Sequence, residues 1–211
     1  MKRNVMLSVL VIIFLSFYAC DASVNRSKSL ADGGRSAGMS SVNGSIRIGA
    51  DCIVNGGCHT VNGGIEVGNG SRVEDLETVN GRIVIGADVE VQGDAQTVNG
   101  SFNAAAGSVV LGQVATVNGR VELTRTVVDR DVSTVNGDVR LGDRSVIRGS
   151  IVIKGRRGIF SGGRRLEIRI EDGSTVEGGI DVRDANRRVR VYIGKDSAVK
   201  GQIRNAKVVK E

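Results

Sequence analysis

Residues 78–96 read Thr-Val-Asn-Gly-Arg-Ile-Val-Ile-Gly-Ala-Asp-Val-Glu-Val-Gln-Gly-Asp-Ala-Gln, and this stretch decides the fold. Ile83 and Ile85 are two residues apart, as are Val89 and Val91, and two is the period of a β-strand. The two pairs are offset by six residues, so the chain turns a corner between them. Three sides of about this length close a triangular coil of about 19 residues.

The motif that opens this stretch recurs along the chain at a nearly constant interval of about 19 residues. The six copies begin at Ser41, Thr60, Thr78, Thr97, Thr116 and Thr134. One coil cannot bury its apolar side, so the repeat predicts stacked coils joined by parallel strands about 4.8 Å apart. We therefore expect an all-β, single-stranded parallel β-helix (a solenoid) with three-sided coils. The general rule for parallel crossovers favours a right-handed helix, with the left-handed hexapeptide helix as the alternative.

The composition fits this fold and excludes others. The 211 residues include 30 Gly, no Pro and no Trp, and aromatic residues make up only 3%. Frequent Gly with small and β-branched apolar side chains suits many short strands joined by tight turns. Collagen is excluded because it needs Gly at every third position together with Pro.

The N-terminus has the pattern of an export signal. Lys2 and Arg3 precede an apolar run over residues 5–18, which is too short to span a bilayer comfortably. Ala19-Cys20 then resembles the lipobox of bacterial lipoproteins. That resemblance implies a signal peptide over residues 1–19, lipidation of Cys20, and a lipid-anchored, periplasm-facing location at the inner or outer membrane of a bacterial cell envelope. An ordinary signal peptide cut after Ala22 and an uncleaved anchor are the alternatives.

The remaining chain divides into a linker and the repeat array. The polar, Gly- and Ser-rich residues 20–40 predict a flexible linker, and residues 41–211 predict the β-helix. Within it, residues 41–152 carry the Thr-Val-Asn-Gly repeats and residues 153–211 form irregular, basic coils.

Two bacterial families resemble parts of the array. Ile-Gly-Lys-Asp-Ser-Ala-Val at residues 193–199 resembles a segment of the bactofilins, polymer-forming cytoskeletal proteins, and the likeness covers residues 142–209. It implies a short-coil β-helix that stacks end to end into filaments. The export signal departs from that family, whose members are mostly cytoplasmic. The Val-Asn-Gly repeats resemble those of bacterial surface proteins identified as adhesins, so the two resemblances agree on fold and differ on function.

The most regular candidate site is a column of asparagines. Asn tolerates turn conformations, and stacked amides can form a hydrogen-bonded ladder along the solenoid axis. A second interpretation is an ice-binding face in which the threonines two residues earlier join the asparagines. The Asn column consists of Asn43, Asn62, Asn80, Asn99, Asn118 and Asn136.

Cysteines and histidine give no metal site. Cys52 and Cys58 both fall on the inward phase, so they are either a disulfide, which export permits, or two small buried hydrophobic residues. His59 is the only histidine and falls on the outward phase. We therefore expect no metal and no cofactor. We also expect no enzymatic activity, because no histidine base or carboxylate pair is suitably placed.

Positive charge is concentrated in the last third of the chain. Residues 20–149 carry 12 basic and 15 acidic residues, whereas residues 150–211 carry 15 basic and 8 acidic residues. Arg156, Arg157, Arg164 and Arg165 are candidates for binding anionic lipid headgroups or envelope polymers. Nucleic acid is not expected as a partner, because the aromatic stacking platforms of such proteins are missing. The sequence thus predicts an envelope-anchored scaffold that self-associates, with an adhesin-like binding module as the alternative.

Overall fold

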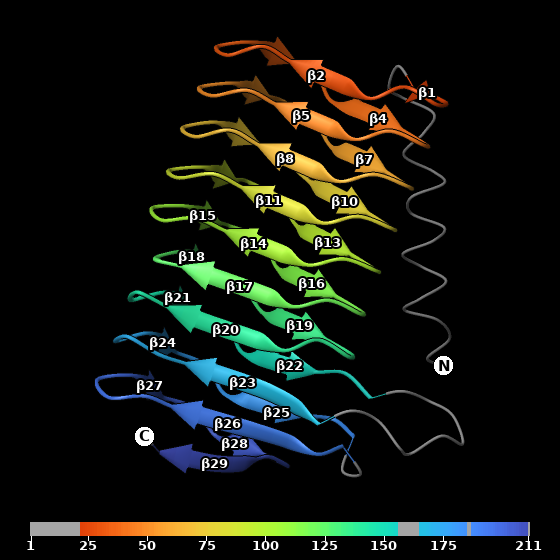
Figure 1. Cartoon of the computed structure of the whole chain (residues 1–211). Coiled ribbons are helices and arrows are strands. Elements are labelled where there is room, and N and C mark those ends of the chain that lie inside the picture. The colour runs from red at the N-terminus through yellow and green to blue at the C-terminus, as the bar shows by residue number, and fades with distance from the viewer. Residues whose placement is uncertain (1–21, 156–164, 185–186, 211) are drawn as a thin grey trace.

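The computed structural model describes residues 22–155, 165–184 and 187–210, and it is a three-sided parallel β-solenoid (Figure 1). The fold class predicted from the repeat is confirmed. Every regular element in the described residues is a strand, so none of them is a helix that could cross a membrane. Each coil contributes one strand to each of three parallel sheets, A, B and C.

Sheet A contains ten strands, which lie in chain order along the solenoid axis. They are β1 (Ala22–Ser23), β4 (Met39–Ser41), β7 (Cys58–Thr60), β10 (Leu76–Thr78), β13 (Ala95–Thr97), β16 (Val114–Thr116), β19 (Val132–Thr134), β22 (Ile151–Ile153), β25 (Ile180–Val182) and β28 (Ile203–Arg204).

Sheet B also contains ten strands and forms the face in the foreground of Figure 1. They are β2 (Lys28–Leu30), β5 (Ile46–Ile48), β8 (Ile65–Val67), β11 (Ile83–Ile85), β14 (Phe102–Ala104), β17 (Val121–Thr124), β20 (Val139–Gly142), β23 (Leu166–Ile170), β26 (Val189–Ile193) and β29 (Lys207–Lys210).

Sheet C contains nine short strands. They are β3 (Arg35–Ser36), β6 (Ile53–Val54), β9 (Arg72–Val73), β12 (Glu90–Val91), β15 (Val109–Val110), β18 (Val127–Val128), β21 (Val146–Ile147), β24 (Thr175–Val176) and β27 (Ala198–Val199).

The core is a set of apolar columns inside the three sheets. Ile83 pairs with Ile65 in the coil before and with Phe102 in the coil after, and all three side chains are fully buried. Along each strand, buried residues alternate with outward ones, as the two-residue period of a strand requires. At β12 of sheet C, Val89 and Val91 are both buried, as their two-residue spacing predicts, and Gln92 beside them is exposed.

The solenoid begins earlier than the repeat motif indicates. The expected flexible linker over residues 20–40 is wrong for residues 22–40, which form a first coil and start the second. Lys28–Leu30 pairs with Ile46–Ile48, and Arg35–Ser36 pairs with Ile53–Val54. The sequence misleads here because a coil at the end of a stack can be held by the backbone ladder of its neighbour, with few apolar side chains of its own.

The later coils are larger because residues are inserted between sheets A and B. Ser150 and Gly179, which are hydrogen bonded between adjacent coils, are 29 residues apart in the chain. In the next pair of coils, the hydrogen-bonded Val182 and Asn205 are 23 residues apart. Strands β23 and β26, which follow the insertions, are each five residues long. The irregular coils expected after residue 152 therefore keep the three-sheet pairing and vary only at one corner.

Candidate functional site

The corner between sheets A and B carries the Thr-Val-Asn-Gly motif, and its threonine, asparagine and glycine each make a different contact. In four coils the buried threonine donates its hydroxyl hydrogen to a backbone carbonyl of the preceding coil, whereas the hydroxyl of Thr134 accepts from the backbone N–H of Gly137. Thr97 Oγ1 lies 2.8 Å from the oxygen of Gly81, and Thr78 Oγ1 lies 2.8 Å from that of Gly63. The hydroxyl is thus satisfied although the side chain is buried.

The buried threonines exclude the ice-binding interpretation. Such a face would need the threonine hydroxyls at the surface, next to the asparagines. Thr60, Thr78 and Thr134 are at most 1% exposed, and Thr97 and Thr116 are 3% exposed. The threonine column is therefore part of the core, and only the asparagine column faces solvent.

The glycine of the motif permits the coils to stack closely. A Cβ atom placed on Gly100 would lie 1.9 Å from the backbone oxygen of Gly81, and one on Gly119 would lie 1.8 Å from the oxygen of Gly100. Real Cβ atoms essentially never approach another heavy atom closer than 3.0 Å. Any side chain at these positions would therefore push neighbouring coils apart.

The asparagines form a continuous ladder of side-chain hydrogen bonds. Each Nδ2 donates to the Oδ1 of the asparagine one coil earlier, at 2.7–2.8 Å. The members are Asn25, Asn43, Asn62, Asn80, Asn99, Asn118 and Asn136. The ladder thus has one more member than the six-residue column of the sequence, and it orders a row of amides along one edge of the solenoid.

The two ends of the ladder were missed by sequence reasoning. Asn25 belongs to Ser23-Val24-Asn25-Arg26, a copy of the motif in which Arg replaces Gly, and its spacing from Asn43, which equals the repeat interval, was the available signal. At the other end, Nη2 of Arg187 donates to Oδ1 of Asn136, which has no following asparagine. These two residues are 51 apart in the chain, so no local pattern connects them.

A shallow polar groove runs beside the ladder on the outer face of sheet B. Its volume is about 470 Å³. Its lining includes the ladder residues Asn118 and Asn136, with Asn103, Glu122 and Asp138 on the neighbouring strands and turns. Amides and carboxylates of this kind offer hydrogen bonds but no aromatic surface, so the groove alone does not define a ligand.

The two cysteines are separate buried thiols. Cys52 and Cys58 are both 0% exposed and are not joined by a disulfide. Cys52 lies at the corner before β6, where its Sγ is 3.1 Å from the carbonyl oxygen of Ala31, and Cys58 lies in β7. Of the two alternatives from the sequence, the structure has the pair of small buried residues.

The outward-facing His59 contacts a carboxylate on the neighbouring strand. Nδ1 of His59 lies 3.2 Å from Oε2 of Glu77 on the neighbouring strand. In the described residues, no group of three or more His, Cys, Asp or Glu side chains is close enough to hold a metal ion.

The lipidation site and the arginine-rich segment fall mostly outside the described residues. Cys20, Arg156, Arg157 and Arg164 lie outside them, so lipidation and anion binding by this segment stay predictions. Arg165, the last of the arginine group, is exposed and immediately precedes β23.

The pKa values of Glu90 and Lys154 are shifted by their surroundings. A hydrogen bond from Arg72 is the main cause that lowers the pKa of Glu90 on the outer face of sheet C. Burial lowers the pKa of Lys154 below its usual value, and the positive charge of Arg183 adds to the effect. Asp131 partly opposes this shift, so burial is its main cause.

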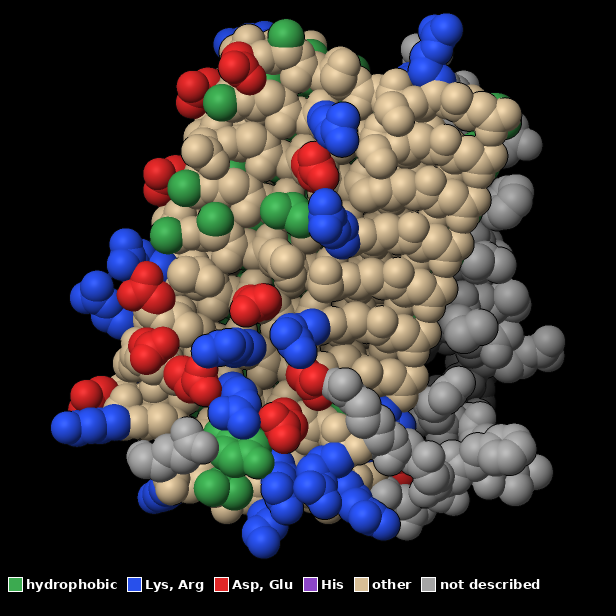
Figure 2. Space-filling model, in the orientation of Figure 1, with side chains coloured by type: hydrophobic (Ala, Val, Ile, Leu, Met, Phe, Trp, Pro, Cys, Tyr) green, Lys and Arg blue, Asp and Glu red, His purple; other side chains and the backbone are tan. Residues whose placement is uncertain are grey.

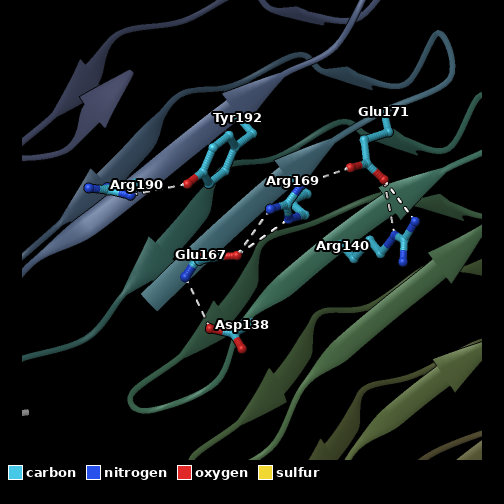
Figure 3. Close-up of polar contacts among 7 residues, drawn as sticks. All are labelled: Asp138, Arg140, Glu167, Arg169, Glu171, Arg190 and Tyr192. Carbon is cyan, nitrogen blue, oxygen red and sulfur yellow. Dashed lines mark hydrogen bonds and ion pairs between the residues drawn. The ribbon is translucent and has the colours of Figure 1, made fainter. Parts of the chain in front are cut away.

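The outer face of sheet B changes in charge along the solenoid axis (Figure 2). In the earlier coils, Glu66 pairs with Arg47 at 3.1 Å and with Arg82 at 3.6 Å. Towards the C-terminal coils, Arg169 bridges Glu167 and Glu171, and Arg140 also reaches Glu171 (Figure 3). Beyond this network the lower end of the face in Figure 2 carries a cluster of Lys and Arg next to a group of hydrophobic side chains.

Comparison with known proteins adds no family to this description. The chain matches no family model, and neither the curated proteins nor the solved structures show a significant match. What the structure defines is the class of protein, a three-sided parallel β-solenoid of repeated short coils.

Proposed function

We propose that the protein is a non-enzymatic scaffold of the bacterial cell envelope that is lipid-anchored at its N-terminus and self-associates through the ends of the solenoid. The proposal combines the predicted export signal and Cys20 with the unpaired strands of the last described coil. The observation that supports it is that the last described coil has unpaired strand edges and partly exposed apolar side chains.

The last coil leaves three strand edges without a neighbour in the described residues. Strands β27, β28 and β29 each pair with only one other strand. Such edges present unpaired backbone N–H and C=O groups, which can recruit strands of another chain.

Apolar side chains are also open at this end. Val208 occupies the inward column, since it pairs with Val191, but it is 40% exposed whereas Val191 is fully buried. Val199, Ile203 and Ala206 are likewise only partly buried. A second copy stacked on this coil would bury these side chains and complete the ladders, as stacked coils do within the chain.

Lysines on the edge strand β29 oppose self-association. Lys207 and Lys210 begin and end β29, and edge lysines are a common defence against strand pairing. We therefore expect self-association to weaken when more positive charge is added at this edge.

Light scattering of the delipidated protein over micromolar concentrations tests the proposal. Assemblies should form with the native sequence and dissociate when Val208 and Val209 are both replaced by Lys. Val84→Lys, on the outer face of β11 far from either end, is the control for an added lysine away from the ends and should leave assembly unchanged. A monomer at all concentrations, or equal effects of the two changes, would overturn end-to-end association.

The second candidate function is a binding module for anionic envelope polymers. The cation excess of the last third favours it, as does the cluster of Lys and Arg at the lower end of the face in Figure 2. If the protein stays monomeric and binds a polyanion, the binding module is favoured over the self-associating scaffold.

A further inference from the structure

Four cations at the C-terminal end of sheet B share one surface. Arg188 and Arg190 flank the inward-facing Val189 at the start of β26, so both side chains point outward from the sheet. Lys207 is the partner of Arg190 in the next strand, and Arg165 directly precedes β23. We call Arg165, Arg188, Arg190 and Lys207 the cation patch.

The patch lacks the acidic partners that balance the rest of the face. Among the described residues, none of its four cations has a carboxylate within ion-pair distance, in contrast to Arg47, Arg140 and Arg169 on the same face. Glu167 is the register partner of Arg190 on the neighbouring strand β23, but its ion pair is with Arg169 at 3.3 Å. The charges of the patch are therefore available to an external anion.

Two of the cations, Arg190 and Lys207, lie on paired strands of sheet B, and Arg165 and Arg188 immediately precede β23 and β26. The guanidinium of Arg169 stacks on the ring of Tyr192 at 4.3 Å from its centroid, and Nη1 of Arg190 lies 3.5 Å from the Tyr192 hydroxyl (Figure 3). Adjacent strands are about 4.8 Å apart, and alternate residues of one strand about 6.6 Å apart. Arg188, Arg190 and Lys207 thus form a compact group of cations where β26 begins and pairs with β29.

We infer that the cation patch is a binding site for an extended anionic glycan, whose carboxylates it recognises by charge and by the bidentate geometry of arginine. Guanidinium groups bind carboxylates in planar pairs, and several at fixed spacing suit a polymer that presents charges in series. This site does not require the scaffold role; it rests on the second candidate function, a binding module for anionic polymers, and names the residues and the ligand class.

A polymer fits this surface better than a bilayer does. The same face carries Glu66, Glu122 and Asp138 in other coils, and these would meet the headgroups of an anionic membrane if the rod lay flat on it. The large hydrophobic residues exposed in the described part of the chain are Val24, Leu111 and Val208, and none lies on the outer face of sheet B. A chain-like ligand can contact the patch alone and avoid the acidic part.

Binding of polygalacturonate, a soluble polycarboxylate glycan, tests the site. The full chain carries Cys20→Ser so that no lipid anchor contributes, and titration calorimetry is run at low salt and at a high salt concentration that screens surface charge. The patch variant replaces Arg188, Arg190 and Lys207 by Gln.

The control variant replaces Arg35, Arg130 and Arg144 by Gln. These cations are exposed, lie outside sheet B and form no ion pair with another described residue. Their replacement lowers the net charge by the same amount as the patch variant does.

We expect the patch variant to lose affinity by about 10- to 100-fold at low salt, and the control by less than about threefold. High salt should weaken binding of the unaltered chain, because the contacts are screened. Arg188→Glu alone, at an exposed position, should give the same direction of change if the triple variant is unstable.

Three outcomes would overturn the inference. Equal losses in the patch and control variants would show that only net charge matters. Binding to anionic phospholipid vesicles, in excess of binding to neutral vesicles and without polygalacturonate binding, would assign the patch to a membrane. No binding of polygalacturonate beyond that of neutral dextran would show that the patch is not a glycan site.

Discussion

Replacing Gly100 by Ala tests whether the glycine of the motif is required for stacking. The added Cβ would lie 1.9 Å from the backbone oxygen of Gly81 and 2.4 Å from its carbonyl carbon. Relief of this clash requires a shift of about 1 Å between two coils. The neighbouring backbone bond from Asn99 N to Val79 O, now 2.7 Å, would then lengthen beyond hydrogen-bonding distance.

The expected cost follows from these two effects. Loss of one backbone hydrogen bond costs about 0.5–1.5 kcal/mol, and the strain of overpacking costs about 1–3 kcal/mol. We therefore expect Gly100→Ala to lower the free energy of unfolding by about 2–4 kcal/mol.

Gly142→Ala is the matched control. Its Cβ would meet nothing closer than Oδ2 of Asp172 at 3.6 Å, an ordinary contact, and the residue has no positive φ. Its effect should lie within about 0.5 kcal/mol, or be slightly stabilising, because alanine restricts the unfolded chain more than glycine does.

Guanidinium denaturation followed by circular dichroism measures both variants. The midpoint and the slope are compared, because repeat arrays can lose full cooperativity and the slope reveals this. If Gly100→Ala is no less stable than Gly142→Ala, close stacking of the motif glycines does not limit the fold, and the reasoning is refuted.

Three further predictions concern the register, the ladder and the anchor. Val91→Asp places an unpaired charge in the core and should cost about 3–5 kcal/mol, whereas Gln92→Asp should stay within about 0.5 kcal/mol; equal costs in chemical denaturation would contradict the inward position of Val91. Asn99→Ala removes two ladder bonds at a solvent-exposed edge and should cost about 1 kcal/mol; no change in the denaturation midpoint would show that the ladder is energetically neutral. Cys20→Ser should abolish lipid attachment, which mass spectrometry of the native N-terminus detects; an unmodified native N-terminus would rule out the lipoprotein prediction.

The sequence by itself determined the coil and its inner columns. Inward residues such as Ile83 and Phe102 recur at the repeat interval, and a coil contacts only the coils before and after it. Burial and strand pairing therefore follow the same period, so the repeat interval is sufficient to predict them.

Only the tertiary structure decided where the array begins, how the ladder ends and which cations stand together. Asn25 is held by Asn43 although its motif lacks the glycine, and Arg187 reaches Asn136 across an insertion of irregular length. The meeting of Arg190 with Lys207 depends on the pairing of β26 with β29, which the altered spacing of the last coils obscures. Where the repeat interval is lost, the residues that face each other are set by strand register and corner geometry, and these become defined only when the coils stack.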